Sequence, residues 1–114
     1  MIKGISVKVD IEGVHCWPDC DIEEVLYLKY PHRHTFEIVC TKHVVHGDRA
    51  IEFIEFKHVL KQYIGQKWYN KSIGCCDFGS MSCEQIAEDL FKHFELNKCV
   101  VSEDGEFFGF VSRD

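Results

Sequence analysis

The spacing of hydrophobic residues changes twice along this chain, and that change constrains the fold more than any other feature of the sequence. Near the N-terminus, apolar residues occupy every second position, at Ile5, Val7, Val9 and Ile11. A period of two residues is typical of a strand with one buried face. Farther along, the apolar residues recur three and four positions apart, which predicts a helix ending near Gly65; they are Phe56, Val59, Leu60, Tyr63 and Ile64.

The remaining segments predict a sheet covered by helices. Residues 25–46 are rich in strand formers, although Pro31 interrupts them, and a second long strand is predicted over 35–45, with extended structure again over 50–53. Ser82 to Gln85 matches a helix capping box, and an Asp104-Gly105 turn joins two final strands. The predicted order is strand, strand, helix, helix, strand, strand. It indicates an α+β fold with an antiparallel sheet and two helices on one face.

Size and charge exclude several classes of function. At 114 residues the chain fits one domain, so 1–114 is treated as a single domain. The net charge of −6 and the lack of any Lys/Arg run argue against nucleic acid or an anionic membrane as a partner. No apolar run approaches the roughly 20 residues that span a bilayer, and no leader-like segment precedes the first strand. We therefore expect a cytoplasmic protein.

Three histidines form the candidate metal site. His32 and His34 are two residues apart at the start of a predicted strand, so both imidazoles lie on the same face. Imidazole suits Zn²⁺, and His15, in the turn after the first strand, is the nearest third ligand. Three protein ligands leave one position open, as expected of a catalytic zinc ion. Taken alone, a His-x-His pair also fits two polar residues on a solvated strand.

Cysteine offers a competing metal site. The odd number of cysteines, 7, and the adjacent pair Cys75-Cys76 favour reduced thiols over a disulfide framework. Cys16 and Cys20, together with Cys75, Cys76 or Cys83, would build a cysteine-rich structural zinc centre. The chain lacks the two Cys-x-x-Cys pairs typical of such centres, which weakens this alternative.

Four segments resemble, in the same order, the motifs of a known family. Gly13-Val14-His15 resembles a small-residue run ending in the first zinc histidine, and His32-Arg33-His34-Thr35-Phe36 resembles a His-Gly-His-x-aromatic motif. Residues 51–60 resemble a strand-to-helix segment in which Glu55 takes the place of an aspartate, and residues 82–87 resemble a Pro-Thr-x-Glu-Asn-Ile-Ala helix start. The set is similar to the 6-pyruvoyl-tetrahydropterin synthase and 6-carboxytetrahydropterin synthase family of the T-fold superfamily.

The resemblance covers nearly the whole chain and implies a fold, a site and an assembly. It implies a T-fold whose subunits pair their sheets into a barrel, as a trimer or hexamer. It implies one Zn²⁺ on His15, His32 and His34, and it aligns Glu103 with the family's pterin-anchoring glutamate. A carboxylate there could accept two adjacent N–H donors of a pterin or purine-like ring. A solvated turn glutamate is the alternative for Glu103.

The implied activity is that of a zinc-dependent pterin synthase or lyase acting on dihydroneopterin triphosphate or a related pterin, as in queuosine or tetrahydrobiopterin biosynthesis. The chain departs from the family at its catalytic groups: Leu28 stands where the family has its cysteine, Arg33 replaces the middle glycine, and no histidine lies between Gln62 and Met81. Cys20, the neighbouring carboxylates Asp19 and Asp21, or His46 with Asp48 could substitute as base. A non-catalytic binder of a pterin or purine-like ligand remains the alternative.

Overall fold

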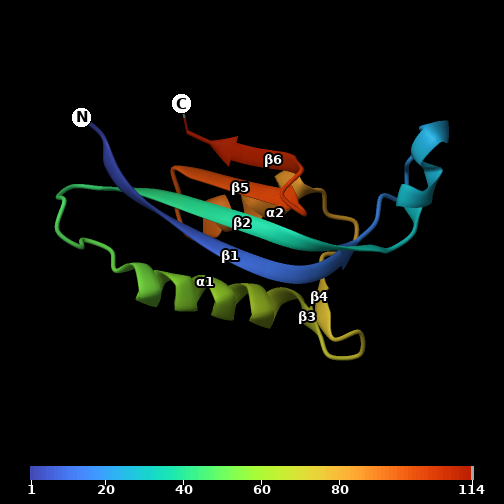
Figure 1. Ribbon diagram of the computed structural model, residues 1–114, viewed down its shortest axis with the longest axis horizontal. Coiled ribbons are helices and arrows are strands. Elements are labelled where there is room, and N and C mark those ends of the chain that lie inside the picture. The colour runs from blue at the N-terminus through green and yellow to red at the C-terminus, as the bar shows by residue number, and fades with distance from the viewer. Residues whose placement is uncertain (114) are drawn as a thin grey trace.

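The computed structural model describes residues 1–113 and consists of one six-stranded sheet with two α-helices against it (Figure 1). The strand order across the sheet is β3-β4-β1-β2-β5-β6. The predicted α+β class is therefore confirmed.

Two long strands form the centre of the sheet. β1 (Lys3–His15) and β2 (His32–Val44) pair antiparallel along their full lengths, from Lys3 opposite Val44 to His15 opposite His32. Both strands contain the alternating apolar residues and β-branched residues that favour extended structure. The pairing leaves the loop between them at the histidine end of the ladder.

The chain ends in a hairpin on the far side of β2. β5 (Lys98–Glu103) pairs antiparallel with both β2 and β6 (Phe107–Ser112). The turn residues Asp104 and Gly105 have φ values of 56° and 72°, a backbone region that Gly and Asp tolerate better than most residues. The hairpin predicted from the Asp-Gly pair is confirmed.

Three local expectations are corrected. The segment before Pro31 is a 3₁₀ helix, η1 (Glu23–Lys29), rather than extended chain. Residues 50–52 are not a strand, because Glu52 caps the next helix. Between the helices lie two short strands that the sequence did not predict, β3 (Tyr69–Asn70) and β4 (Cys75–Asp77), and β4 runs parallel to β1. The sheet is therefore mixed rather than wholly antiparallel.

Each α-helix begins at a side chain that satisfies its first backbone N–H groups. At α1 (Phe53–Trp68), the carboxylate of Glu52 accepts hydrogen bonds from the N–H groups of Ile54 and Glu55. At α2 (Cys83–His93), Ser82 and Gln85 form the predicted capping box. α1 continues through Gly65, where its end was predicted, because Ile64 and Trp68 on its last turns are buried.

Both helices cover the same face of the sheet. α1 packs on β1 and β4, and α2 packs on β5 and β6 (Figure 1). The side chains between the helices and the sheet form one apolar core that includes Val7, Val9, Phe36, Ile38, Leu60, Ile64, Ile86, Leu90 and Val101. The opposite face of the sheet carries the polar members of each alternating pair, such as Lys8 and Glu37, which form an ion pair. Within residues 1–113, no helix is long and apolar enough to cross a membrane.

Gly13 is required by the way two aromatic rings pack over β1. A Cβ atom at this position would lie 2.6 Å from a ring carbon of Phe78 and 3.1 Å from one of Phe36. We expect Gly13→Ala to lower the free energy of unfolding by about 1–3 kcal/mol, because the rings must move apart. Chemical denaturation followed by circular dichroism measures the change.

Gly65→Ala is the matched control, because a Cβ there meets nothing within 4 Å. Alanine in the interior of α1 should raise the free energy of unfolding by about 0.5–1 kcal/mol. Equal effects of the two substitutions would contradict the role assigned to Gly13.

Candidate metal centre

Four polar side chains continue the buried face of the sheet beyond its apolar core. On β2, alternation places His32 and His34 on the same face as Phe36. The register places His15 opposite His32, and it places Glu103 opposite Phe36 on the neighbouring strand. The predicted common face of His32 and His34 is confirmed.

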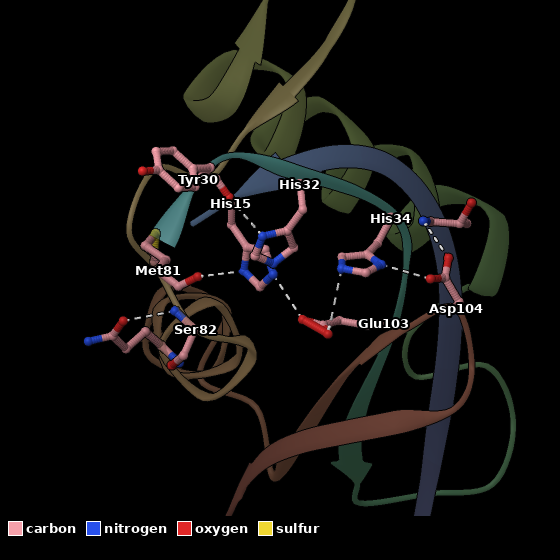
Figure 2. A network of polar contacts seen from close by, with 10 residues as sticks. His15, Tyr30, His32, His34, Met81, Ser82, Glu103 and Asp104 are labelled. Atoms are coloured by element: carbon pink, nitrogen blue, oxygen red, sulfur yellow. Dashed lines mark hydrogen bonds and ion pairs between the residues drawn. The ribbon is translucent and has the colours of Figure 1, made fainter. Parts of the chain in front are cut away.

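The ends of these strands bring four ligand atoms together. One nitrogen from each of the three histidines and one oxygen of Glu103 all lie within 4.8 Å of one another. His15 Nε2 is 2.8 Å from Glu103 Oε1, and His34 Nε2 is 3.7 Å from Glu103 Oε2. Figure 2 shows the imidazoles of His15 and His34 turned toward this carboxylate. This group can hold a metal ion.

The Nδ1 atom of each of these three histidines lies within hydrogen-bonding distance of an oxygen atom. His15 Nδ1 lies 2.9 Å from the carbonyl oxygen of Met81, and His32 Nδ1 lies 3.0 Å from that of Tyr30. His34 Nδ1 lies 2.7 Å from the carboxylate of Asp104 (Figure 2). Because these oxygens accept hydrogen bonds, each Nδ1 is the protonated nitrogen and acts as the donor.

Because Nδ1 donates a hydrogen bond in each histidine, the other ring nitrogen, Nε2, is the one available as a metal ligand. A neutral histidine protonated at Nδ1 presents a lone pair at Nε2. His15 Nε2 is buried and makes no hydrogen bond of acceptable geometry, although it lies within ion-pairing distance of Glu103. A lone pair facing a carboxylate oxygen is repulsive unless a proton or a cation lies between them. The donor set therefore fits a metal ion, and outer-shell partners of this kind orient metal ligands in known sites.

The surroundings favour a neutral His15. Burial lowers the pKa of His15 below its ordinary value, and the positive charge that His32 can carry acts in the same direction, against the opposing hydrogen bond to Met81 and charge of Glu103. Hydrogen bonds from the Thr35 N–H and from His34 lower the pKa of Asp104, so this carboxylate is ionised and can accept. Both effects support metal ligation, because a histidine must lose its proton to bind a metal ion.

His15, His32, His34 and Glu103 are called the metal group below. A cavity of about 720 Å³ lies beside this group, and the first turn of α2 forms part of its wall. His15, His32 and Glu103 lie in its wall, and the aromatic side chains of Trp17 and Phe107 line it as well. A volume of this size is typical of a site for a small organic molecule. The metal group therefore faces a space that a ligand could enter.

Of the residues proposed as bases, Asp19 lines this cavity, whereas Cys20, His46 and Asp48 do not. Cys20 is buried, and its thiol donates a long hydrogen bond to the carbonyl of Val25. His46 and Asp48 follow β2 at the opposite end of the β1–β2 ladder. A 13-residue strand at about 3.3 Å per residue separates them from the histidines by roughly 40 Å within the chain. Cys16, which the sequence did not suggest as a base, also lines the cavity.

The cysteine-rich alternative finds no support among residues 1–113, in which the metal-binding group contains no cysteine. All seven cysteines are free. Cys83 lines the cavity, but burial raises the pKa of its thiol to about 12, so it is neutral at physiological pH.

Sequence reasoning missed the residues that orient the histidines. Asp104 was predicted only as part of a turn, although the same turn places its backbone N–H on the carbonyl of Thr35, next to His34. The available signal was that Asp104 directly follows Glu103, a candidate site residue, in the sequence. The carbonyls of Met81 and Tyr30 had no such signal, because any residue type supplies a carbonyl.

Comparisons with known proteins bear on the fold alone. No known protein family matches the chain, and no curated protein matches it. Among solved structures, the chain is similar to an uncharacterized protein from Wolinella succinogenes, with a TM-score of 0.74 at 11% sequence identity. The match covers 100% of this chain and 99% of that chain, so the two share their whole architecture.

Proposed function

We propose that this chain is a zinc protein that binds a pterin or purine-like ligand in the cavity beside the metal. The observation that supports this most directly is the orientation of His15, His32 and His34. Each has its Nδ1–H occupied by an oxygen, and each turns a free Nε2 toward the same region as Glu103.

The donor set favours zinc over the other common divalent ions. Imidazole nitrogens with a carboxylate are common zinc ligands, whereas Mg²⁺ and Ca²⁺ prefer oxygen ligands throughout. When bound in such a site, zinc polarises oxygen atoms of a ligand and lowers their pKa. The chain's own contribution is to hold the imidazoles in position and to exclude water from His15.

The cavity suits a flat, nitrogen-rich ring. Glu103 lies in its wall and can accept two adjacent N–H donors, which fixes the orientation of a ring as well as binding it. Trp17 and Phe107 are exposed aromatic side chains in the same cavity, available to pack against a ring face. These features match the pterin ring that the family resemblance implies.

A lyase or synthase reaction on a pterin is the second candidate function. It requires a group that moves protons near the metal. Cys16 and Asp19 line the same cavity as His15, so they replace Cys20, His46 and Asp48 as the residues to test.

The T-fold and its barrel assembly belong to the same proposal. The order of long elements, β1, β2, α1, α2, β5 and β6, agrees with that fold, and β6 leaves one edge of the sheet unpaired in the described chain. Phe107, Phe108 and Phe110 are exposed along this edge strand. Pairing with another subunit would protect them, which supports the expected trimer or hexamer.

The metal proposal predicts zinc content. The purified protein should contain one zinc ion per chain by mass spectrometry of the metal, and His32→Ala or His34→Ala should lose it because each removes an Nε2 ligand. Both histidines are only partly buried, so these variants should fold. His58→Ala, an exposed position on α1, is the control and should retain zinc. Full zinc content in the first two variants would refute the site.

Asp104 should increase the affinity for zinc without coordinating the ion itself. Asp104→Asn keeps a residue that tolerates the positive φ of 56° but removes the charge that accepts the His34 hydrogen bond. We expect a loss of zinc affinity on the order of 10–100-fold, measured by competition with a chromophoric chelator. Unchanged affinity would show that Asp104 is only a turn residue.

Ligand binding and turnover separate the two candidate functions. The zinc-loaded protein should bind dihydroneopterin triphosphate in calorimetry, and removal of zinc should weaken the binding. Chromatography of the same mixture shows whether the pterin is consumed: intact ligand supports a binder, whereas product that disappears with Cys16→Ala or Asp19→Asn supports an enzyme. Absence of binding by the zinc-loaded protein would reject both.

A further inference from the structure

Glu103 has an unusual set of polar neighbours. Within residues 1–113, its carboxylate makes polar contacts only with His15 Nε2, at 2.8 Å, and His34 Nε2, at 3.7 Å. In the neutral form of the two histidines, both Nε2 atoms present lone pairs, because the corresponding Nδ1 atoms are the donors. A carboxylate whose neighbours are acceptors lacks the donors that normally compensate it.

The distances fit a shared tetrahedral ion. Four ligands at about 2.0–2.1 Å from a tetrahedral zinc ion lie roughly 3.3–3.4 Å from one another. One oxygen of Glu103 is 2.8 Å from His15 Nε2 and the other is 3.7 Å from His34 Nε2, so the carboxylate lies near that spacing from both nitrogens, and one ligand atom from each of the four residues lies within 4.8 Å of the others. Small side-chain rotations therefore suffice to place all four donors around one ion. His15 is held at the core of this group, with its side chain only 8% exposed.

The same carboxylate also lies in the wall of the cavity. Glu103 is the last residue of β5, directly before the turn that carries Asp104, and it pairs with Phe36 on β2 and Phe107 on β6. It can reach either the metal group or a ring in the cavity. The ring-anchoring role and the metal-ligand role use the same oxygen atoms and cannot be filled together.

We propose that Glu103 is the fourth metal ligand when the cavity is empty, and that a ring ligand displaces it from the metal. This inference rests on the proposed function and adds a regulatory step to the same site. In the absence of the ring ligand, Glu103 occupies the fourth metal position, so small anions and water cannot bind there. The ligand class it admits must offer N–H donors to the freed carboxylate and an oxygen to the vacated metal position, which a simple anion cannot do.

Cobalt substitution tests this inference directly. The full chain is loaded with Co²⁺, whose visible absorption reports the ligands, and is titrated with azide. We expect the wild-type spectrum to stay unchanged by azide, because Glu103 occupies the fourth position. Glu103→Ala should show a saturable spectral shift with azide and should lose more zinc affinity than Asp104→Asn, which removes an outer-shell partner and costs on the order of 10–100-fold.

A matched control separates coordination from charge. Glu84→Ala removes a carboxylate that lines the same cavity but does not belong to the metal group, so its cobalt spectrum should resist azide as the wild type does. Glu103→Gln, which preserves side-chain shape, should behave like Glu103→Ala and guards against a folding defect in the alanine variant.

The outcomes are distinguishable from failure of the proposed function. If the wild type binds cobalt and azide shifts its spectrum as in Glu103→Ala, the fourth-ligand inference is overturned while the three-histidine site stands. If the wild type binds neither cobalt nor zinc, the metal centre itself is rejected. If a pterin shifts the wild-type spectrum where azide does not, exchange of Glu103 for the ring ligand is supported.

Discussion

The antiparallel pairing of β1 with β2 sets the positions of the three histidines of the site. Its register places His15 directly opposite His32, and it places Gly13 opposite His34. A slip of one residue would turn these side chains to the other face of the sheet, since the side-chain period of a strand is two. The apolar core on the same face holds the register, so the packing that stabilises the fold also positions the histidines that could hold a metal ion.

The site lies at one end of the hydrophobic core, where polar side chains follow the apolar ones on the same face of the sheet. Phe36 packs edge-on against the rings of His15 and His34, with ring centroids 5.1 Å and 5.9 Å away. The ligands are therefore held by packing on one side and by the hydrogen bonds of their Nδ1 atoms on the other. This arrangement leaves little freedom to the imidazoles, which lowers the conformational cost of binding an ion. It also concentrates lone pairs and negative charge at one point, a situation that a cation relieves.

The role of Glu103 links the metal to the cavity. As a ring anchor alone, it would leave a zinc ion with an open position at all times. As the proposed metal ligand that can be displaced, it would keep the ion closed until a molecule with suitable donors arrives. The burial of Cys20 away from the cavity agrees with a site in which recognition comes before any chemistry. Cys16 and Asp19 are the residues on which an activity would depend.

Local signals in the sequence are enough to predict the long elements and the common face of two ligands, whereas contacts between distant segments depend on the assembled sheet. Alternation in β1 and β2, helical spacing in α1, the Ser82 capping box and the Asp104-Gly105 turn each involve residues close together in the chain. For the same reason, the two-residue spacing of His32 and His34 suffices to place both side chains on one face.

The contacts of His15 with Met81 and Glu103, in contrast, join residues more than sixty positions apart, and no local pattern encodes such a pairing. The parallel pairing of β4, the position of His46 and Asp48 at the far end of the ladder, and the support of His34 by Asp104 follow from strand register and from the path of the chain over the sheet. They are properties of the packed core, since they depend on which surfaces meet rather than on the preference of any one segment.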